Sequence, residues 1–436
     1  MSLAAIVGRP NVGKSTLFNK LTGARTAIVD DTPGVTRDRI YGKCEWLGRE
    51  FSLVDTGGID RQDTGEILTS MREQAELAIE TADVIIFVTD LRSGVTAGDK
   101  EVAALLQKSG KPVVLGVNKC DTVGDLPAEL YEFYNLGIGA PFPLSSVHGH
   151  GTGDMLDEVV KHLPPEQSTE QPDKLAIAII GKPNAGKSSL VNKIAGENRM
   201  IVSDVAGTTR DAVDTEIVHM GEKYVLIDTA GLRRKSRVSE NVEKYAALRA
   251  FMAVDRADVC VMMIDAVEGY TEQDSKVAGY AHDKGKPTVI AVNKWDLIEK
   301  DDKTMKEFTK DLERDFSFMK YVPFVFISAL TGQRINKLFE LVRYVSEQNA
   351  RRISTGMLND MLAVATARVQ PPTDKGRRLK LYYITQASVK PPTFVIFCNK
   401  IDLFHFSYQR YIENQIRETF ELGGTPIVIV ARERGE

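Results

Sequence analysis

Two glycine-rich segments end in a lysine and a serine with the spacing of a phosphate-binding loop. Gly8–Ser15 reads GRPNVGKS, and Gly181–Ser188 reads GKPNAGKS. Glycines in such a loop let consecutive backbone N–H groups converge on an anion, and the helix that follows adds its dipole. We therefore expect Lys14 and Lys187 to reach the β- and γ-phosphates of a bound nucleotide.

Oxygen-bearing side chains at matched positions predict a Mg²⁺ site in each repeat. The serine that closes each loop offers a hydroxyl to the ion. The aspartate of an Asp-Thr-x-Gly motif follows a strand-like run and can orient Mg²⁺ through a water molecule. The threonine of a Thr-Arg-Asp motif is either a second hydroxyl ligand, present only with triphosphate bound, or a turn residue, and the matched repeat favours the ligand. The predicted Mg²⁺ ligands are Ser15, Thr36, Asp55, Ser188, Thr209 and Asp228.

The glycine that ends each Asp-Thr-x-Gly motif, Gly58 or Gly231, can donate its backbone N–H to the γ-phosphate. Hydrolysis would then release this loop, which is how a nucleotide-dependent switch works. The residues predicted to act in hydrolysis are Lys14, Thr36, Gly58, Lys187, Thr209 and Gly231.

An Asn-Lys-x-Asp motif in each repeat predicts which base is bound. The carboxylate of Asp121 or Asp296 can accept hydrogen bonds from N1–H and the N2 amine of guanine, a donor pair that adenine lacks. With adenine a buried charge would stay unpaired, which disfavours that base strongly. Lys119 and Lys294 would lie along the base plane. Ser145-Ser146 and Ser328-Ala329 are predicted to offer backbone N–H groups to guanine O6.

Neither repeat places a glutamine after the Asp-Thr-x-Gly motif to orient the attacking water; Ile59 and Leu232 stand there instead. Asn11 and Asn184, inside the two loops, carry side-chain oxygens that could ligate K⁺ near the phosphates. K⁺ would supply the positive charge that an arginine finger supplies elsewhere. The alternative is that asparagine tolerates a tight loop conformation.

The predicted nucleotide contacts follow these motifs. In the first repeat they are Gly8, Arg9, Pro10, Asn11, Val12, Gly13, Lys14, Ser15, Asp55, Thr56, Gly57, Gly58, Ile59, Asn118, Lys119, Cys120, Asp121, Ser145 and Ser146. In the second repeat they are Gly181, Lys182, Pro183, Asn184, Ala185, Gly186, Lys187, Ser188, Asp228, Thr229, Ala230, Gly231, Leu232, Asn293, Lys294, Trp295, Asp296, Ser328 and Ala329.

The elements that position these motifs repeat as well. The first three motifs recur at one constant displacement along the chain and the fourth at a slightly larger one, so the chain holds a duplicated domain. Apolar runs at 3–7, 84–90 and 113–118 alternate with helical stretches at 67–81, 97–109 and 152–162, which is typical of a doubly wound, mostly parallel α/β sheet. Ligands bind at the carboxyl ends of such strands, where the motifs begin.

The predicted domains are 1–163, a linker at 164–174, 175–350 and 351–436. Pro164–Lys174 is polar and has no apolar periodicity, which is typical of a linker. In the second repeat, strands are expected at 175–180, 259–265, 288–293 and 323–328. The last segment has an α-β-β-α-β order, with helices at 355–368 and 408–420 and strands at 378–388, 393–399 and 426–431, and it predicts a small α+β domain.

Composition indicates the class of protein, its cellular compartment and a possible type of partner. The chain has 436 residues, of which 43% are hydrophobic and 27% charged, as in ordinary globular proteins. No apolar run approaches the roughly 18 residues that a membrane-spanning helix needs, and no signal sequence is recognisable, so we expect no membrane association. Four cysteines without metal spacing fit a reducing cytosol, with Cys260 a core thiol. Residues 351–436 carry 13 Lys/Arg against 8 Asp/Glu on an otherwise acidic chain, which suggests either a polyanionic partner or an ordinary solvated surface.

The motif set resembles the TRAFAC-class translation GTPases. Two such domains in tandem before a small basic domain look like the Der (EngA) family, the double-Era-like ribosome-assembly GTPases, and GVTRD, GTTRD, DTAGLRRKSRV and KPPTF support this beyond the generic motifs. The resemblance implies a cytoplasmic, monomeric GTP hydrolase that matures the large ribosomal subunit by acting on its rRNA, with a KH-like last domain. It also favours K⁺ at Asn11 and Asn184.

Two departures from the family pattern and two alternative functions stay open. The first repeat has DTGG and Asn-Lys-Cys-Asp where the second has DTAG and Asn-Lys-Trp-Asp. The last domain lacks the Gly-x-x-Gly loop with which KH domains clamp nucleotides, so it either binds RNA or serves as a docking platform for the GTPase domains. The chain is either a hydrolysing switch, for which a slow intrinsic rate is expected, or mainly a nucleotide-dependent binding module. A tRNA-modifying GTPase would be expected to have a single GTPase domain.

Overall fold

The computed structural model describes residues 2–23, 41–58, 67–121, 127–165, 174–197, 214–228, 242–299, 303–374 and 376–433. The chain divides into two compact units, Met1–Glu170 and Gln171–Glu436. Their boundary lies within the segment that we predict to be a linker. The other predicted domain boundary, between 350 and 351, falls inside the second unit and stays a prediction.

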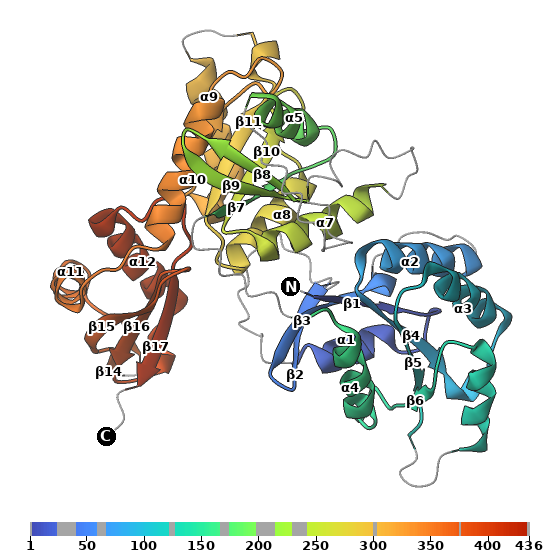
Figure 1. The fold of residues 1–436 in the computed structure, drawn as a ribbon. Helices are drawn as coiled ribbons and strands as arrows, with labels where there is room; N and C mark the ends of the chain where they lie inside the picture. The colour runs from blue at the N-terminus through green and yellow to red at the C-terminus, as the bar shows by residue number, and fades with distance from the viewer. Residues whose placement is uncertain are drawn as a thin grey trace. The chain divides into compact units, whose positions relative to one another are not determined.

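The first unit is a six-stranded sheet in the order β2-β3-β1-β4-β5-β6, in which β2 is antiparallel to its neighbour and the others are parallel. Helices α1 and α4 cover one face, and α2 and α3 the other (Figure 1). The strands are β1 Leu3–Val7, β2 Tyr41–Trp46, β3 Arg49–Asp55, β4 Val84–Asp90, β5 Val113–Asn118 and β6 Pro141–Pro143. The helices are α1 Lys14–Leu21, α2 Ile67–Thr81, α3 Ala97–Ser109 and α4 Thr152–His162, with short 3₁₀ turns at Thr56–Gly58, Leu91–Ser93 and Ala128–Leu136.

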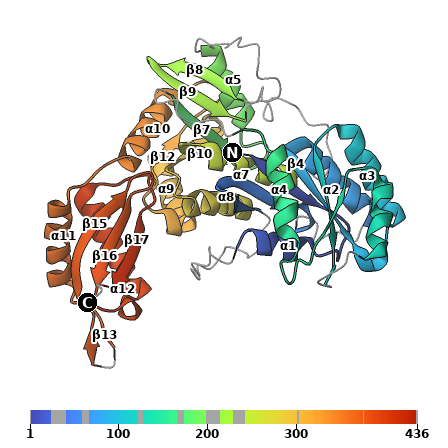
Figure 2. The same ribbon diagram turned by 60° about the horizontal axis from the view of Figure 1, so that its bottom comes forward.

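The second unit begins with a sheet of the same topology, β12-β11-β10-β7-β9-β8 (Figure 2). Its strands are β7 Leu175–Ile180, β8 Thr215–His219, β9 Glu222–Ile227, β10 Val259–Asp265, β11 Thr288–Asn293 and β12 Phe324–Phe326. Its helices are α5 Lys187–Glu197, α7 Val242–Arg256, α8 Glu272–Asp283, α9 Thr304–Asp315 and α10 Ile335–Asn349, with 3₁₀ turns at Trp295–Leu297 and Ser317–Met319.

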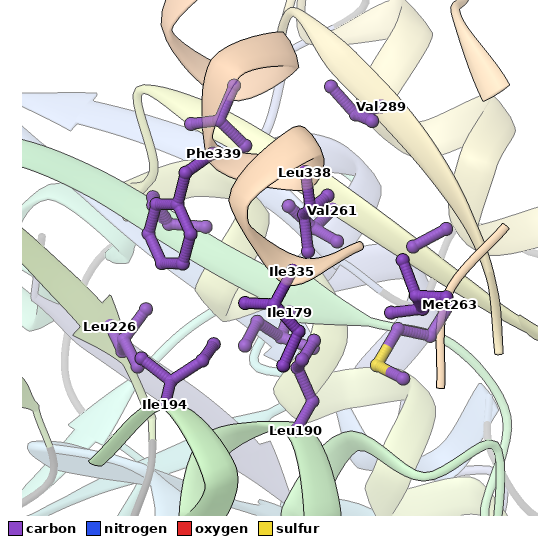
Figure 3. Close-up of a cluster of buried hydrophobic side chains, with 14 of the residues drawn as sticks. Ile179, Leu190, Ile194, Leu226, Val261, Met263, Val289, Ile335, Leu338 and Phe339 are labelled. Carbon is purple, nitrogen blue, oxygen red and sulfur yellow. The ribbon is translucent and has the colours of Figure 1, made fainter. Parts of the chain in front are cut away.

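Strand β10 shows why these strands are apolar throughout. Its side chains point alternately to the two faces, and both faces are buried. Val261 and Met263 pack with Leu190 of α5 and Leu338 of α10 (Figure 3), whereas Met262 packs with residues of α7 and α8. Each such buried side chain contributes about 1.5–3 kcal/mol, so the sheet is held firmly and its loops have a fixed base.

The last part of the second unit is a three-stranded sheet, β15-β16-β17, with helices α11 and α12 packed on one face. Its elements are α11 Thr355–Arg368, β13 Thr373–Asp374, β14 Arg377–Arg378, β15 Leu381–Ser388, β16 Thr393–Cys398, the 3₁₀ turn Ile401–Leu403, α12 Phe406–Phe420 and β17 Val428–Glu433. The α-β-β-α-β order predicted from the sequence is confirmed.

Two predicted strands in this domain were wrong in their limits. The strand expected at 378–388 is interrupted, because Arg377–Arg378 pairs with Thr373–Asp374 in a separate hairpin. The side chain of Asn399 fills the gap by donating to Arg378 O at 2.9 Å and accepting from Lys380 N at 2.9 Å. The last strand runs over Val428–Glu433 rather than 426–431, since Thr425 instead turns to the six-stranded domain of the second unit.

That turn joins the last domain to the six-stranded domain within the same unit. Thr425 Oγ1 donates to Asn349 Oδ1 at 2.7 Å, and the N–H of Thr288 donates to Gly424 O at 2.8 Å. The guanidinium of Arg417 lies 4.1 Å from the centre of the Tyr321 ring. Strand β11, which leads to the Asn-Lys-x-Asp motif, is therefore anchored at its start by the last domain.

Candidate nucleotide-binding sites

The two glycine-rich loops connect β1 to α1 and β7 to α5 and have the same backbone shape. Asn11 and Gly13 have φ values of 65° and 95°, and Asn184 and Gly186 have 62° and 95°. Left-handed residues at these positions are typical of concave loops whose successive N–H groups can turn toward an anion at a helix N-terminus. The two loops therefore share one backbone shape, and phosphate binding there stays a prediction.

The loop lysines lie across these concave sites. Lys14 Nζ donates to Gly8 O at 2.6 Å and to Arg9 O at 2.9 Å. Lys187 Nζ donates to the matching carbonyls of Gly181 and Lys182 at 2.7 and 2.6 Å. The carbonyls hold each ammonium over its loop, where it can meet the phosphates.

Burial gives Lys187 an unusual titration. It lowers the pKa of the ammonium to about 8, and the nearby carboxylate of Asp274 opposes the shift. A bound phosphate favours the charged form, so GTP binding at the second site should raise this pKa and take up a proton. Affinity for GTP is therefore expected to fall as pH rises through about 8. Calorimetry somewhat above this pKa, in two buffers of different ionisation enthalpy, should detect the uptake, and no uptake would contradict this account of Lys187.

Two of the three predicted Mg²⁺ ligands of the first repeat, Ser15 and Asp55, lie side by side. Ser15 Oγ donates to Asp55 Oδ2 at 2.6 Å, and Asp55 Oδ1 accepts from Gly57 N at 2.9 Å. A hydroxyl and a carboxylate are the hard oxygen donors that Mg²⁺ takes beside phosphates, so these residues fit the ion. In the second repeat Asp228 directly follows strand β9 with a φ of 56°, and its N–H donates to Asp214 Oδ1 at 3.0 Å.

Each Asn-Lys-x-Asp asparagine ties two loops together. Asn118 Nδ2 donates to Val12 O at 2.6 Å, while its Oδ1 accepts from Ser146 N at 2.9 Å. Asn293 makes the matching bonds with Ala185 O and Ala329 N, both at 2.8 Å. The asparagines therefore position the phosphate loop against the loop after the last strand, a role that the sequence did not reveal.

Lys119 and Lys294, here called the specificity lysines after the role predicted for their motif, have fixed partners, as does Asp121. Lys119 Nζ donates to Asp90 Oδ2 at 2.6 Å, and Lys294 Nζ to Asp265 Oδ2 at 2.5 Å. Asp121 accepts from Ser145 Oγ and from Arg92 Nη2, each at 2.7 Å. The Ser145 hydroxyl, together with Arg92, holds the pKa of Asp121 below its ordinary value. The carboxylate is thus ionised and able to accept hydrogen bonds from a base.

The backbone N–H groups that follow the last strand of each sheet were predicted to bind guanine O6, but they donate to partners within the protein. Ser146 N and Ala329 N donate to the asparagines described above. Ser145 N donates to His150 O at 3.0 Å and Ser328 N to Gln333 O at 3.2 Å. All four groups are bonded within the protein, because the loop folds back on itself before its helix. The Ser145 side chain instead supports Asp121, and a contact of these N–H groups with guanine stays a prediction.

Several other predicted contacts have side chains that point into the protein. The side chains of Val12, Cys120, Ala185 and Trp295 are buried in the cores. The Thr56 hydroxyl donates to Ile6 O at 2.6 Å inside the sheet. Only the backbone of these residues can face a nucleotide. Thr36, Ile59, Thr209, Thr229, Ala230, Gly231 and Leu232 lie outside the described residues.

Sequence reasoning missed Asp90 and Asp265, which hold the specificity lysines. Both end a strand, and their displacement along the chain equals that of the Asn-Lys-x-Asp motifs. This equal displacement is the signal that could have found them.

Comparisons with known proteins agree with this arrangement. Residues 3–119 and 176–294 match a family model described as 50S ribosome-binding GTPase. Residues 352–432 match the KH-domain-like domain of EngA bacterial GTPase enzymes, C-terminal. Relatives named GTPase Der include those of Ruminiclostridium cellulolyticum, 59% identical over 99% of this chain and 98% of that protein, and Lachnospira eligens, 58% identical over 100% and 99%. The chain belongs to the GTPase Der family.

Membership of this family confirms the resemblance and the fold class predicted from the sequence. The protein has two P-loop GTPase domains and a C-terminal KH-like domain. GTPases of this class bind GTP or GDP together with Mg²⁺. Within the described ranges, no helix is both long and apolar enough to cross a membrane.

Proposed function

We propose that the protein hydrolyses GTP to GDP and phosphate at two sites and acts as a nucleotide-dependent switch in assembly of the large ribosomal subunit. The observation that carries this proposal is the duplicated constellation of phosphate loop, lysine and guanine-recognising aspartate. The family model for both GTPase segments is described as 50S ribosome-binding, which supports the partner. We propose that it works as a monomer in the cytoplasm, where ribosomes are assembled.

At each site, different residues bind the phosphates, the guanine base and Mg²⁺. The loop N–H groups and Lys14 or Lys187 hold the phosphates, and Asp121 or Asp296 selects guanine. Ser15 and Asp55 in the first repeat, with Ser188 and Asp228 in the second, would hold Mg²⁺, which neutralises charge on the β- and γ-phosphates when bound. Thr36 and Thr209 would complete the set, and Gly58 and Gly231 would sense the γ-phosphate.

Without a glutamine to orient water, K⁺ at Asn11 and Asn184 is proposed to supply transition-state charge. Both side chains are exposed beside the phosphate loop. Replacing K⁺ with Na⁺ should then slow GTP hydrolysis about ten-fold or more. Steady-state turnover in matched K⁺ and Na⁺ buffers measures this.

Glycine at position 11 or 184 separates this proposal from its alternative. Glycine keeps the left-handed backbone and removes the side-chain oxygen. If the asparagine binds K⁺, Asn184→Gly or Asn11→Gly at the active repeat should abolish the difference between the two salts. A glycine variant that still prefers K⁺ would leave asparagine as a loop residue only.

Turnover tests whether the protein is a switch or mainly a binding module. A switch that is slow alone should hydrolyse GTP faster when large ribosomal subunits are added in K⁺ buffer. A binding module should associate with the subunits without any change in rate.

The KH-like domain is proposed to help bind rRNA. Arg377 and Arg378 are exposed on its β13–β14 hairpin. Changing both to glutamate should weaken binding to large subunits and lower the log–log salt slope by about two, since two phosphate contacts are lost. GTP turnover of the free protein should stay unchanged. The matched control reverses the exposed Lys306 and Lys310 of α9.

Normal subunit binding by the Arg377→Glu/Arg378→Glu variant would contradict an RNA role for this hairpin. The hairpin is a two-residue ladder with Gly376 at its turn rather than a Gly-x-x-Gly loop. The domain would then serve as a platform for the GTPase domain to which Thr425 and Gly424 attach it. The RNA contact would have to be sought in the basic segment 233–237, which lies outside the described residues.

A further inference from the structure

Each GTPase domain buries an aspartate beside its phosphate loop, and no motif described above includes it. Asp99 and Asp274 are both 0% exposed. They are the third residues of α3 and α8, and their displacement along the chain again equals that of the Asn-Lys-x-Asp motifs. A fully buried carboxylate is rare unless it is paired, so its second oxygen needs an explanation.

One oxygen of each carboxylate closes a capping box. Asp99 Oδ2 accepts from Thr96 N at 3.0 Å and Thr96 Oγ1 at 2.7 Å. Asp274 Oδ2 accepts from Thr271 N at 3.1 Å and Thr271 Oγ1 at 2.7 Å. Capping a helix in this way occupies a single oxygen and does not require burial. It does not explain why both carboxylates are buried.

In the first repeat the other oxygen faces the second residue of the phosphate loop. Asp99 Oδ1 makes no hydrogen bond and lies 3.7 Å from Arg9 Nε, whose own N–H is also buried without a partner. Asp274 Oδ1 likewise accepts no hydrogen bond of good geometry. Burial raises the pKa of Asp274, while the Thr271 hydroxyl and the charge and backbone N–H of Lys182 lower it. The phosphate loop thus supplies a cation near the buried carboxylate in both repeats: Arg9 lies 3.7 Å from Asp99, and the charge of Lys182 lowers the pKa of Asp274.

The cationic side chains of Arg9 and Lys182 contact equivalent segments of the two domains, just before α3 and α8. Arg9 also donates to Ser93 Oγ, and Lys182, with only 7% of its side chain exposed, pairs with Glu268 Oε2 at 2.7 Å and donates to Gly269 O at 3.4 Å. The residue types differ, but a positive charge in the loop and a carboxylate in the helix occur in both. The side chains of Arg9 and Lys182 thus lie against the segment before the helix, although the sequence predicted them as nucleotide contacts.

We propose that Asp99 and Asp274 are positioning residues that hold the phosphate loop in its binding shape through Arg9 and Lys182. The inference rests on the proposed role of these loops in GTP binding. The segments 90–99 and 265–274 would link the two halves of each site, because their first residues, Asp90 and Asp265, hold the specificity lysines. Loosening this link should affect GTP and GDP alike and should raise KM more than it lowers kcat.

The test uses the full chain with Asp121→Asn, so that GTP and GDP report on the second site. Asp274→Asn keeps the size and one capping oxygen but removes the charge. We expect it to weaken both nucleotides about ten-fold, and Lys182→Gln to do the same. Lys182→Arg should retain affinity. The double variant should be weakened by at least about three-fold less than the product of the single effects.

The control is Asp154→Asn, the same change at an exposed first-turn position of α4. Thermal unfolding of every variant separates folding from binding. An Asp274→Asn variant that unfolds earlier but binds GTP and GDP normally would show a capping role alone. Fully multiplicative effects of the two changes would equally overturn the proposal. If Lys187→Ala also leaves nucleotide binding intact, the assignment of the phosphate loop itself is wrong.

Discussion

Replacing Asp121 or Asp296 with asparagine is expected to weaken GTP binding at the altered site by about 2–5 kcal/mol, because each carboxylate would accept two charge-assisted hydrogen bonds from guanine. The amide can accept only one of them, while its NH₂ group faces the N2 amine. Site-resolved titration with a fluorescent GTP analogue measures the change. The untouched repeat is the internal control in each variant.

Xanthine nucleotides provide a second test of the same assignment. Xanthine carries a carbonyl where guanine has the N2 amine, so an asparagine NH₂ group can donate to it. Each variant should therefore bind xanthosine triphosphate more tightly than the unaltered site does. Unchanged GTP affinity in either variant would reject that aspartate as the guanine-recognising residue.

The second large effect is expected from Gly186→Ala in the phosphate loop. A Cβ at this position would lie 2.1 Å from Asn293 Nδ2, and the backbone has a φ of 95°. The change should both strain the loop and displace the asparagine that ties it to Ala329. We expect GTP affinity at the second site to fall by about 2–5 kcal/mol, combining backbone strain with a lost buried hydrogen bond.

Gly221→Ala is the matched control. Gly221 lies in the same domain with a φ of 86°, but a Cβ there would meet no atom within 4 Å. It should show the strain of a left-handed alanine in thermal unfolding without any change in nucleotide affinity. If Gly186→Ala binds GTP as well as the control does, the contact between the loop and Asn293 has no part in binding.

The central strands were predictable because a strand that is buried on both faces is a continuous apolar run, which is visible in the sequence. The strands at 84–90, 113–118, 259–265 and 288–293 have the predicted limits, since both faces of each are covered and nearly every residue is apolar. The interruption before β15 was not predictable. It depends on the side chain of Asn399, which lies 21 residues from the carbonyl of Arg378 that it binds.

In the binding sites too, features set by local sequence could be predicted, whereas features set by contacts between distant residues could not. Motif spacing was sufficient to predict that Ser15 and Asp55 lie together, because both follow strands whose ends meet at one edge of the sheet, and their roles toward a nucleotide stay predictions. The bonds of Asn118 to Val12 O and Ser146 N could not be predicted, since they depend on which loops the fold brings together. The Thr-x-x-Asp capping pattern at Asp99 is visible in the sequence, but its burial against Arg9 appears only in three dimensions.

Co-sedimentation with large ribosomal subunits tests the central claim most directly. The protein would be sedimented with purified subunits in GDP, GTP and a non-hydrolysable GTP analogue, at one fixed salt concentration. We predict strong association with the analogue, weak association with GDP, and loss of the difference when Asp121→Asn and Asp296→Asn are combined. Equal association in all three nucleotides, or none in any, would contradict a nucleotide-dependent switch that acts on the large subunit.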